Sequence, residues 1–379
     1  MPDVEGEDDE NLNMNVDEDF GGPRRVPGVR FRSELWWMKR RDALLQCGYA
    51  LRSRYQPDWV PSWQGTKKNY EDQEDGQDNP HRAGLDATRT SDGRHVMLKK
   101  VIPQEGPYEL QINQLFASEP LASDPRNHCA QILEVIKLPG EDEEKLLVMP
   151  LLRQYDDPPF ETYGEVVAFL SQLFEGVQFM NENNVAHRDC TQFNVMYDPS
   201  PMYADSYHPV ETRRRRDWKG DAKYYTRTQR PPRYYLIDFG LSRRYNPADG
   251  PPLEMVLRGG DKSAPEHRSP APPPCNPFPT DIYYLGNLIR ENFLQKCYGF
   301  EFVEPLVKDM VLDDPEKRPK IDEVVSRFEE IRASLSKSKL RSRVVRRKEV
   351  WVVGMWRSVG YWYRRAGYFL QRKAAIPDP

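Results

Sequence analysis

The chain has 379 residues, a formal net charge of −4 and 38% hydrophobic residues. This length suits one large or two modest domains, and the middle of the chain has enough apolar content for a sizeable core. The five cysteines show no CxxC or Cys/His spacing, which argues against a disulfide framework or a structural zinc site and favours a reducing compartment. Without a signal-peptide pattern, or an apolar run near the ~20 residues of a spanning helix, we expect an intracellular protein, cytoplasmic or nuclear, that is neither secreted nor membrane-spanning.

Charge is distributed unevenly along the chain. Residues 1–20 carry nine acidic residues and no basic one, whereas residues 337–373 carry twelve basic residues and one acidic residue. Residues 1–30 have too few apolar groups to offset the entropy of ordering, so we expect an acidic disordered tail. Residues 31–82 form an extension of uncertain structure. Within it we predict a short helix at 33–45 with Ser33 as its N-cap, followed by a flexible polar loop at 67–79.

Residues 83–149 are interpreted as a small β-rich lobe with one main helix. Asp92-Gly93 is a hairpin signal between two apolar strands, the second at 95–102. Pro107 can begin a helix whose apolar residues recur at helical spacing. Two further strands are predicted at 131–138 and 145–150, around an acidic turn at 140–144.

Residues 150–335 are interpreted as a larger, mostly helical lobe. Thr162 and Glu165 have capping-box spacing ahead of a helix that runs to about residue 183. Further amphipathic helices are predicted at 282–293 and 321–335, with a rigid proline-rich loop at 270–279. A long insertion at 198–233 contains a basic run, 213–216. A solvated loop is the default interpretation of this insertion, with nuclear import or docking of an acidic partner as alternatives.

Two motifs in the larger lobe carry the strongest chemical signal. The first is His187-Arg188-Asp189-Cys190-Thr191-Gln192-Phe193-Asn194, and the second is Asp238-Phe239-Gly240 after an apolar run. One Asp can accept a hydroxyl proton, while an Asn five residues later and a second Asp can together hold Mg²⁺ against ATP phosphates. Together, the order, the fixed spacing and the strand-like flanks predict phosphoryl transfer.

These landmarks occur in an order that resembles the eukaryotic protein-kinase superfamily, across roughly residues 83–335. Where the chain departs from the usual kinase pattern, as described below, it is similar to divergent fungal-type kinase-like proteins. The resemblance implies an α+β, bilobed fold with ATP and Mg²⁺ as cofactors. It also implies that Asp189 orients a substrate hydroxyl and accepts its proton, with Asn194 and Asp238 as metal ligands.

The resemblance extends to nucleotide-binding residues in the smaller lobe. Val96-Met97-Leu98-Lys99 resembles the family's VAIK strand, which implies that Lys99 clamps the α- and β-phosphates and that Glu109 is its ion-pair partner. Lys100 and Glu105 are competing candidates, and a surface lysine or helix-surface carboxylate is the plain alternative for each. Met149 and Leu151 fall in the implied hinge, where backbone groups would hydrogen-bond adenine.

Other landmarks imply structural roles. Glu266, in Ala264-Pro265-Glu266, is paired by resemblance with Arg318, and Asp281 is expected to brace the catalytic loop. We expect His187 to pack this loop and Cys190 to be a small buried group. These late landmarks favour a protein kinase over a small-molecule kinase. The remaining structural motif residues are Arg188, Phe239 and Gly240.

The chain departs from the family pattern at three places, one of which is the insertion at 198–233. No GxGxxG loop precedes Lys99, and Thr191 matches neither the serine/threonine-kinase nor the tyrosine-kinase signature. Arg188, beside Asp189, needs a partner for its positive charge, and a phosphorylated residue after Asp238 could supply one. Ser242 and Ser263 are candidate phosphorylation sites, and a constitutive arrangement is the alternative.

A protein kinase is the leading functional hypothesis, with Ser/Thr favoured over Tyr by base rate and a protein as substrate. A pseudokinase scaffold that binds nucleotide or partner proteins is the alternative. A small-molecule kinase is the third option.

The tail at 336–379 mixes basic and aromatic residues. Three interpretations are open: packing against the core with burial of the tryptophans, binding to an anionic membrane surface or an acidic partner, and nucleic-acid binding. Nucleic acid is disfavoured because no nucleic-acid-binding motif accompanies the charge.

Overall fold

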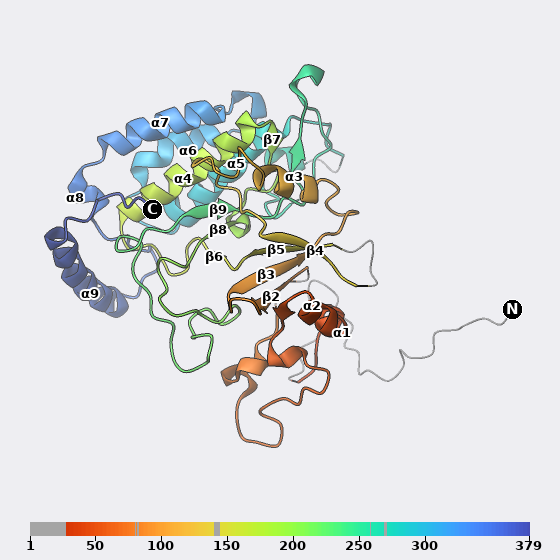
Figure 1. The fold of residues 1–379 in the computed structure, drawn as a ribbon. Helices are drawn as coiled ribbons and strands as arrows, with labels where there is room; N and C mark the ends of the chain where they lie inside the picture. The colour runs from red at the N-terminus through yellow and green to blue at the C-terminus, as the bar shows by residue number, and fades with distance from the viewer. Residues whose placement is uncertain (1–27, 80, 82, 140–144, 258, 269–270) are drawn as a thin grey trace. The chain divides into compact units, whose positions relative to one another are not determined.

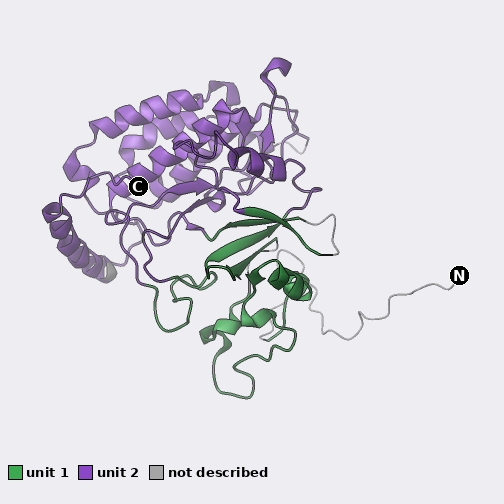
Figure 2. Cartoon of the chain, viewed as in Figure 1, with its two compact units in different colours: residues 1–100, 134–151, 206–222 green, residues 101–133, 152–205, 223–379 purple. Residues whose placement is uncertain are grey.

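The computed structural model of the chain describes residues 28–79, 81, 83–139, 145–257, 259–268 and 271–379. It is an α+β protein with two compact units (Figures 1 and 2). Unit 1 comprises residues 1–100, 134–151 and 206–222, and unit 2 comprises residues 101–133, 152–205 and 223–379. Most of the expected acidic disordered tail, and the expected acidic turn at 140–144, lie outside the described residues.

Unit 1 is built on a five-stranded antiparallel sheet in the order β1-β2-β3-β5-β4. Along β3 the buried Val96 and Leu98 alternate with half-buried residues, so one face of the sheet covers an apolar core. The predicted hairpin is present: Arg89 N donates to the Arg94 carbonyl, and Gly93 has a φ of +72° that favours glycine. The strands are β1 (Tyr49–Ala50), β2 (Gly84–Arg89), β3 (His95–Lys100), β4 (Glu134–Lys137) and β5 (Lys145–Pro150).

The extension before the sheet is an ordered part of unit 1. The predicted helix at 33–45 is instead two helices, α1 (Arg32–Lys39) and α2 (Arg41–Gln46), and the N-cap of α1 is Phe31 rather than Ser33. Trp37 and Leu44 are fully buried in the core. Short 3₁₀ turns at Tyr70–Asp72 and Glu74–Gly76 lie within the predicted polar loop, where the buried Asp75 accepts a hydrogen bond from Trp59 Nε1 at 2.9 Å.

The middle of the 198–233 insertion belongs to unit 1, and the solvated-loop interpretation holds for the exposed Arg213 but not for the packed residues His208 and Arg216. Arg216 Nη1 lies 3.0 Å from Asp86 Oδ2, and the fully buried His208 lies 3.2 Å from Glu74 Oε1. Asp86 also accepts from Arg52 Nε at 3.1 Å. Burial alone would raise the pKa of the Asp86 carboxyl, but the charges of Arg52 and Arg216 outweigh burial and lower it.

We predict that Asp86→Asn lowers the free energy of unfolding by about 3–5 kcal/mol, because it leaves the buried Arg52 guanidinium without a full counter-charge. Urea unfolding measures this loss. Asp92→Asn is the matched control, since Asp92 pairs with Arg89 at the surface and should matter little. Equal loss in the two variants would contradict a stabilising role for the buried pair.

Unit 2 is mainly helical, as expected for the larger part of the chain. The capping box is present: Glu165 N donates to Thr162 Oγ1 at 3.1 Å, and Glu165 Oε2 accepts from Thr162 N at 3.4 Å. This cap begins α4, whose buried side packs on α7. The helices are α3 (Glu109–Phe116), α4 (Tyr163–Glu182), α5 (Pro277–Ile289), α6 (Glu304–Met310), α7 (Ile321–Ser334), α8 (Lys337–Leu340) and α9 (Trp351–Leu370), with a π-helical turn at Arg290–Leu294.

Unit 2 also contains two small antiparallel sheets, ordered β6-β8-β9 and β10-β7. Their strands are β6 (Arg153–Gln154), β7 (Val185–Ala186), β8 (Val195–Tyr197), β9 (Tyr234–Leu236) and β10 (Arg243–Arg244). Helix α3, expected in the β-rich lobe, belongs to unit 2 and begins at Glu109 rather than Pro107. Helix α5 begins inside the expected proline-rich loop, because Pro277 occupies its first turn and Asn276 caps it.

The later part of the insertion also packs firmly, within unit 2. Arg227 is 2% exposed and donates to the Tyr155 and Pro158 carbonyls and to Tyr234 Oη. Within the described part of the chain, the five cysteines are free thiols and no helix is both long and apolar enough to cross a bilayer.

Candidate active site

The two predicted motifs meet in unit 2 through strand pairing. The strand β8 follows Asn194 directly and pairs with β9, which leads into Asp238. Ile237 N donates to the Asn194 carbonyl at 3.0 Å, so the pairing continues to the residue before Asp238. The antiparallel register therefore brings Asn194 beside the start of the second motif, although the two are far apart in sequence.

The Asp189 carboxylate is held on both oxygens. Asn194 Nδ2 donates to Asp189 Oδ2 at 2.8 Å and to the Asp189 carbonyl at 2.9 Å. Gly260 N donates to Asp189 Oδ1 at 2.9 Å. Burial raises the pKa of Asp189 to about 6, with contributions from the charges of Asp238 and Asp261 that the two hydrogen bonds oppose.

Asp281 braces the loop that carries Asp189. It is fully buried on α5, and its carboxylate accepts from His187 N at 2.8 Å and from Arg188 N at 2.7 Å. The Cys190 thiol lies 3.2 Å from Asp281 Oδ1, and burial raises its pKa well above the ordinary value. Cys190 is therefore placed as a buried thiol, and Asp281 holds two consecutive backbone amides at the start of the loop.

His187 is fixed by hydrogen bonds on both ring nitrogens. Asp189 N donates to its Nδ1 at 3.3 Å, so the proton lies on Nε2 and donates to the Ile237 carbonyl at 3.1 Å. Its ring packs on Phe239 with centroids 5.5 Å apart, and Phe239 packs on Phe116 of α3 at 6.0 Å. The geometry gives His187 a packing role.

Asp238 and Glu109 bring two carboxylates close to Gly240. A Cβ built at Gly240 would lie 3.2 Å from Asp238 Oδ1 and 3.8 Å from Glu109 Oε2. Glu109 is 4% exposed, whereas the competing Glu105 is exposed. Asp238 has a φ of +64°, a conformation that non-glycine residues rarely adopt and that is common at functional sites.

Arg188 has an acidic partner within the chain. Its Nη2 lies 4.0 Å from Glu254 Oε2 and donates to the Met255 carbonyl at 3.2 Å. Glu254 also pairs with Arg243 at 2.6 Å. The candidate phosphorylation site Ser242 is 1% exposed and donates to the His187 carbonyl at 2.9 Å, whereas Ser263 is exposed. Glu254 gives Arg188 an acidic partner without phosphorylation, which favours the constitutive arrangement.

Under the phosphoryl-transfer hypothesis from the sequence, we predict that Glu254→Gln lowers the transfer rate several-fold, because Arg188 loses the charge that neutralises it. Treatment of the wild-type chain with a phosphatase should leave the rate unchanged. Glu211→Gln is the control, since Glu211 lies in unit 1 and pairs there with its exposed neighbour Arg213. A wild-type rate that falls after phosphatase treatment would contradict this role for Glu254.

Two glycines that lie against Asp189 and Thr191 were missed by sequence reasoning. A Cβ at Gly259 would lie 2.5 Å from Asp189 Oδ1, and a Cβ at Gly260 would lie 3.2 Å from Thr191 Oγ1. Only glycine allows the backbone to come this close and to donate its amide to Asp189. The Gly-Gly pair itself was the available signal, although it does not indicate which carboxylate it contacts.

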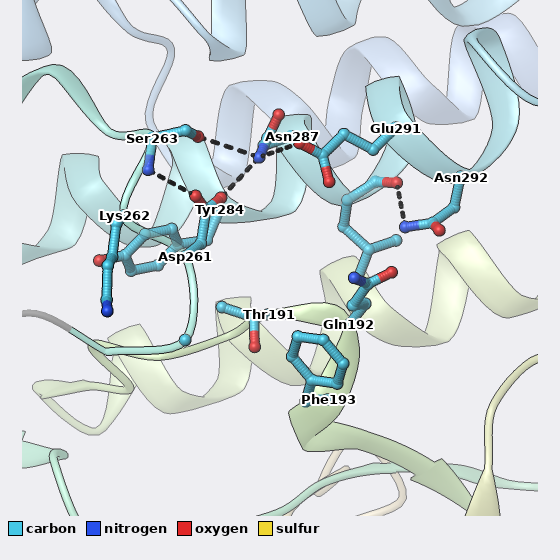
Figure 3. Close-up of a pocket in the computed structure, with 12 residues that line it drawn as sticks. Thr191, Gln192, Phe193, Asp261, Lys262, Ser263, Tyr284, Asn287, Glu291 and Asn292 are labelled. Atoms are coloured by element: carbon cyan, nitrogen blue, oxygen red, sulfur yellow. Dashed lines mark hydrogen bonds between the residues drawn. The ribbon is translucent and has the colours of Figure 1, made fainter. Parts of the chain in front are cut away.

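A cavity of about 270 Å³ opens beside this loop in unit 2 (Figure 3). Thr191, Gly260 and Lys262 line one part, and α5 lines another, where Asn287 Nδ2 lies 2.6 Å from Asp261 Oδ2. Thr191 is 4% exposed, and its hydroxyl has no hydrogen-bond partner among the described residues. Such an unpaired hydroxyl is costly unless a ligand uses it.

We predict that Thr191→Val lowers the transfer rate at least about tenfold if the hydroxyl contacts the reacting groups. The melting temperature should stay the same or rise, because a methyl group replaces an unpaired buried hydroxyl. Ser171→Ala is the control: Ser171 also has an unpaired buried hydroxyl, but it lies on α4 outside the cavity, and its loss should not change the rate. An unchanged rate in Thr191→Val would show that the hydroxyl is not used.

The predicted nucleotide-binding residues of unit 1 lie on neighbouring strands. Lys99 is on β3 opposite Leu147 of β5, and Met149 of β5 is opposite Met97. Lys100 Nζ lies 4.6 Å from the ring of Trp36, on the core side of the sheet. Because side chains alternate along a strand, Lys99 points to the other side, which separates it from its competitor. Leu151 directly follows β5.

Glu266 and Arg318 form the expected ion pair in unit 2. Arg318 Nη1 lies 2.6 Å from Glu266 Oε1, and Nη2 donates to Oε2 at 2.9 Å. Both side chains are buried. The pair fixes the end of the segment that begins at Asp238.

No model of a known protein family matches the chain, and no curated protein matches its sequence. The function is therefore inferred from the residues and their geometry.

Proposed function

We propose that this chain is a protein kinase, which transfers the γ-phosphate of Mg-ATP to a protein hydroxyl, with serine or threonine favoured over tyrosine. The observation that carries the proposal is the setting of Asp189. Its carboxylate is held by Asn194 and Gly260, lies beside a cavity, and has a pKa raised by burial to about 6. A positioned carboxylate with a pKa near neutrality is suited to general-base chemistry.

Asn194 and Asp238 fit a magnesium site that substrate phosphates complete. Asn194 uses its Nδ2 group on Asp189, which leaves Oδ1 with no hydrogen bond from any described residue. Amide and carboxylate oxygens suit Mg²⁺, which usually takes one or two protein ligands together with phosphates. The described residues contain no group of three or more His, Cys, Asp or Glu side chains that could hold a metal without phosphates. Bound Mg²⁺ would neutralise charge on the phosphates.

In the proposed phosphate transfer, individual residues of the chain would have separate roles. Asp189 would orient the substrate hydroxyl and accept its proton as the oxygen attacks the γ-phosphorus and ADP departs. Thr191 supplies a hydroxyl beside Asp189. The contacts assigned to Lys99, Glu109, Met149 and Leu151 rest on the kinase resemblance, and backbone contacts at the last two suit an adenine ring.

The binding half of the proposal is tested by thermal unfolding with ATP. A ligand of the folded state raises the melting temperature by mass action. We expect ATP to stabilise the wild-type chain more with Mg²⁺ than without it, and Asp238→Asn to lose the magnesium-dependent part. Asp249→Asn is the control, an exposed acid in the same segment. A shift that is independent of Mg²⁺ and equal in all three chains would contradict the metal assignment.

One observation favours the scaffold alternative. The chain between β1 and β2 contains 3₁₀ turns and has no glycine-rich loop that would cover phosphates. A scaffold would show nucleotide-dependent stabilisation without phosphate transfer. The two functions are therefore separated by measuring both properties on one preparation.

A further inference from the structure

Helix α9 turns its aromatic side chains to solvent. Trp351 is 76% exposed, Trp356 is 69% exposed and Trp362 is 60% exposed. At 3.6 residues per turn, these side chains and their apolar neighbours fall within an arc of about 140° on one side of the helix. The apolar neighbours in this arc include Val359, Phe369 and Leu370, all exposed.

The opposite side of α9 is fixed to unit 2. Tyr361 and Tyr368 are buried, and Glu161 accepts from Arg364 Nε at 2.8 Å and from Tyr368 Oη at 3.1 Å. Arg357 pairs with Glu349 at 3.2 Å. These contacts set the rotation of the helix, which lies at the edge of unit 2 in dark blue (Figure 1). The tail therefore packs on its own unit, as one of the three interpretations proposed, but without the burial of the tryptophans that this interpretation included.

An apolar face of this extent needs a cover, because soluble chains rarely expose large contiguous apolar patches. The charge around the face indicates which cover fits. Every charged residue at 350–373 is basic, and the exposed run 346–348 just before the helix is basic too. A second copy of the chain would bring like charges together. Nucleic acid would require the arginines on the exposed face, whereas Arg357 and Arg364 turn onto Glu349 and Glu161.

We propose that α9 lies flat in the surface of an anionic lipid bilayer. Its exposed apolar side chains enter the headgroup boundary, where Trp and Tyr are enriched, and the basic residues at its ends meet the negative headgroups. Arg365 suits this role: its guanidinium lies 4.8 Å from the ring of Trp362, at the border of the apolar face. The proposal does not depend on kinase activity.

Co-sedimentation of the full chain with vesicles tests the proposal. We expect binding to phosphatidylcholine vesicles that contain phosphatidylserine, weaker binding to pure phosphatidylcholine, and release by salt. The double variant Trp356→Ser/Trp362→Ser should bind at least about tenfold more weakly, because it removes two apolar groups from the interface. The matched control is Val60→Ser/Leu253→Ser, which changes two exposed apolar residues that are not part of α9 and should bind like wild type.

Equal melting temperatures of the two double variants and wild type would verify that all three are folded, since the changed side chains are exposed. The proposal is overturned if wild type stays in the supernatant with anionic vesicles at low salt, or if the tryptophan variant binds as tightly as wild type. Equal binding to neutral and anionic vesicles would overturn the charge argument. A wild-type dimer that the tryptophan variant converts to a monomer in sedimentation velocity would assign the face to a second copy instead.

Discussion

Asp189→Asn is expected to lower the rate of phosphate transfer by about 10²–10⁴, because the asparagine keeps the size of the side chain but cannot accept the substrate proton. Nucleotide-dependent stabilisation should remain, since Asn194 and Asp238 are unchanged. The rate is measured with γ-labelled ATP and generic protein substrates, at saturating nucleotide. The control is Asp249→Asn, which should keep the wild-type rate.

The pH dependence of the wild-type rate follows from the same carboxylate. Burial raises the pKa of Asp189 to about 6, and the base works only when ionised. The rate should therefore rise as the pH increases through about 6 and then level off. For stability the sign is opposite: the protonated form is favoured in the folded state, so this group's contribution to stability is lost as pH rises through the same value. A rate that is independent of pH across this range would contradict the role of Asp189.

Arg318→Ala is expected to lower the free energy of unfolding of the chain by about 3–5 kcal/mol, because it leaves the Glu266 carboxylate buried without its partner. The Arg318 side chain is fully buried and also donates to the Leu312 and Pro279 carbonyls, which would lose their donors. The free energy of unfolding of Arg318→Lys should lie between those of wild type and Arg318→Ala, since lysine keeps the charge but cannot form both hydrogen bonds to Glu266. Urea unfolding measures the difference.

A surface ion pair and the pH dependence of stability provide two checks on the role of the Arg318–Glu266 pair. Arg268→Ala removes a surface pair with Asp313 from the same region and should change stability little. Burial would raise the pKa of Glu266, but the hydrogen bond and charge of Arg318 lower it overall. Its contribution to stability is therefore present above the unfolded pKa of about 4 and is lost as pH falls through the lower folded value. A wild-type advantage that persists unchanged in acid would show that packing, rather than charge, accounts for the loss.

Local spacing accounts for the contact between Asp189 and Asn194, although the motif indicated Asn194 only as a metal ligand. The two residues are five positions apart in one motif, and the structure joins them by a hydrogen bond. The capping box at Thr162 was predictable for the same reason. Alternating burial in β3 and the turn at Gly93 were likewise local signals, and the structure contains both.

Contacts between distant segments had no such signal. Glu254 meets Arg188, and Gly260 meets Asp189, only because of the path of the chain after Asp238. Arg216 belongs to a basic run that resembles a solvated loop, yet it pairs with the buried Asp86. The spacing of residues within each segment does not predict these long-range contacts, because they depend on tertiary packing.

Helix α9 shows the same limit in another form. Its composition indicates an amphipathic segment, but not which face turns inward. That choice depends on Glu161, far away in sequence, which accepts from Arg364 and Tyr368. The tryptophans face outward because the opposite side of the helix, which carries Arg364, is bound to Glu161.

Transfer of labelled γ-phosphate from Mg-ATP to a protein substrate by the purified full chain tests the central claim most directly. The account predicts labelled product from wild type and from Asp249→Asn, and loss of that product in both Asp189→Asn and Asp238→Asn. Equal labelling by all four chains, or none by wild type under conditions in which ATP stabilises it, would contradict a catalytic role for these residues.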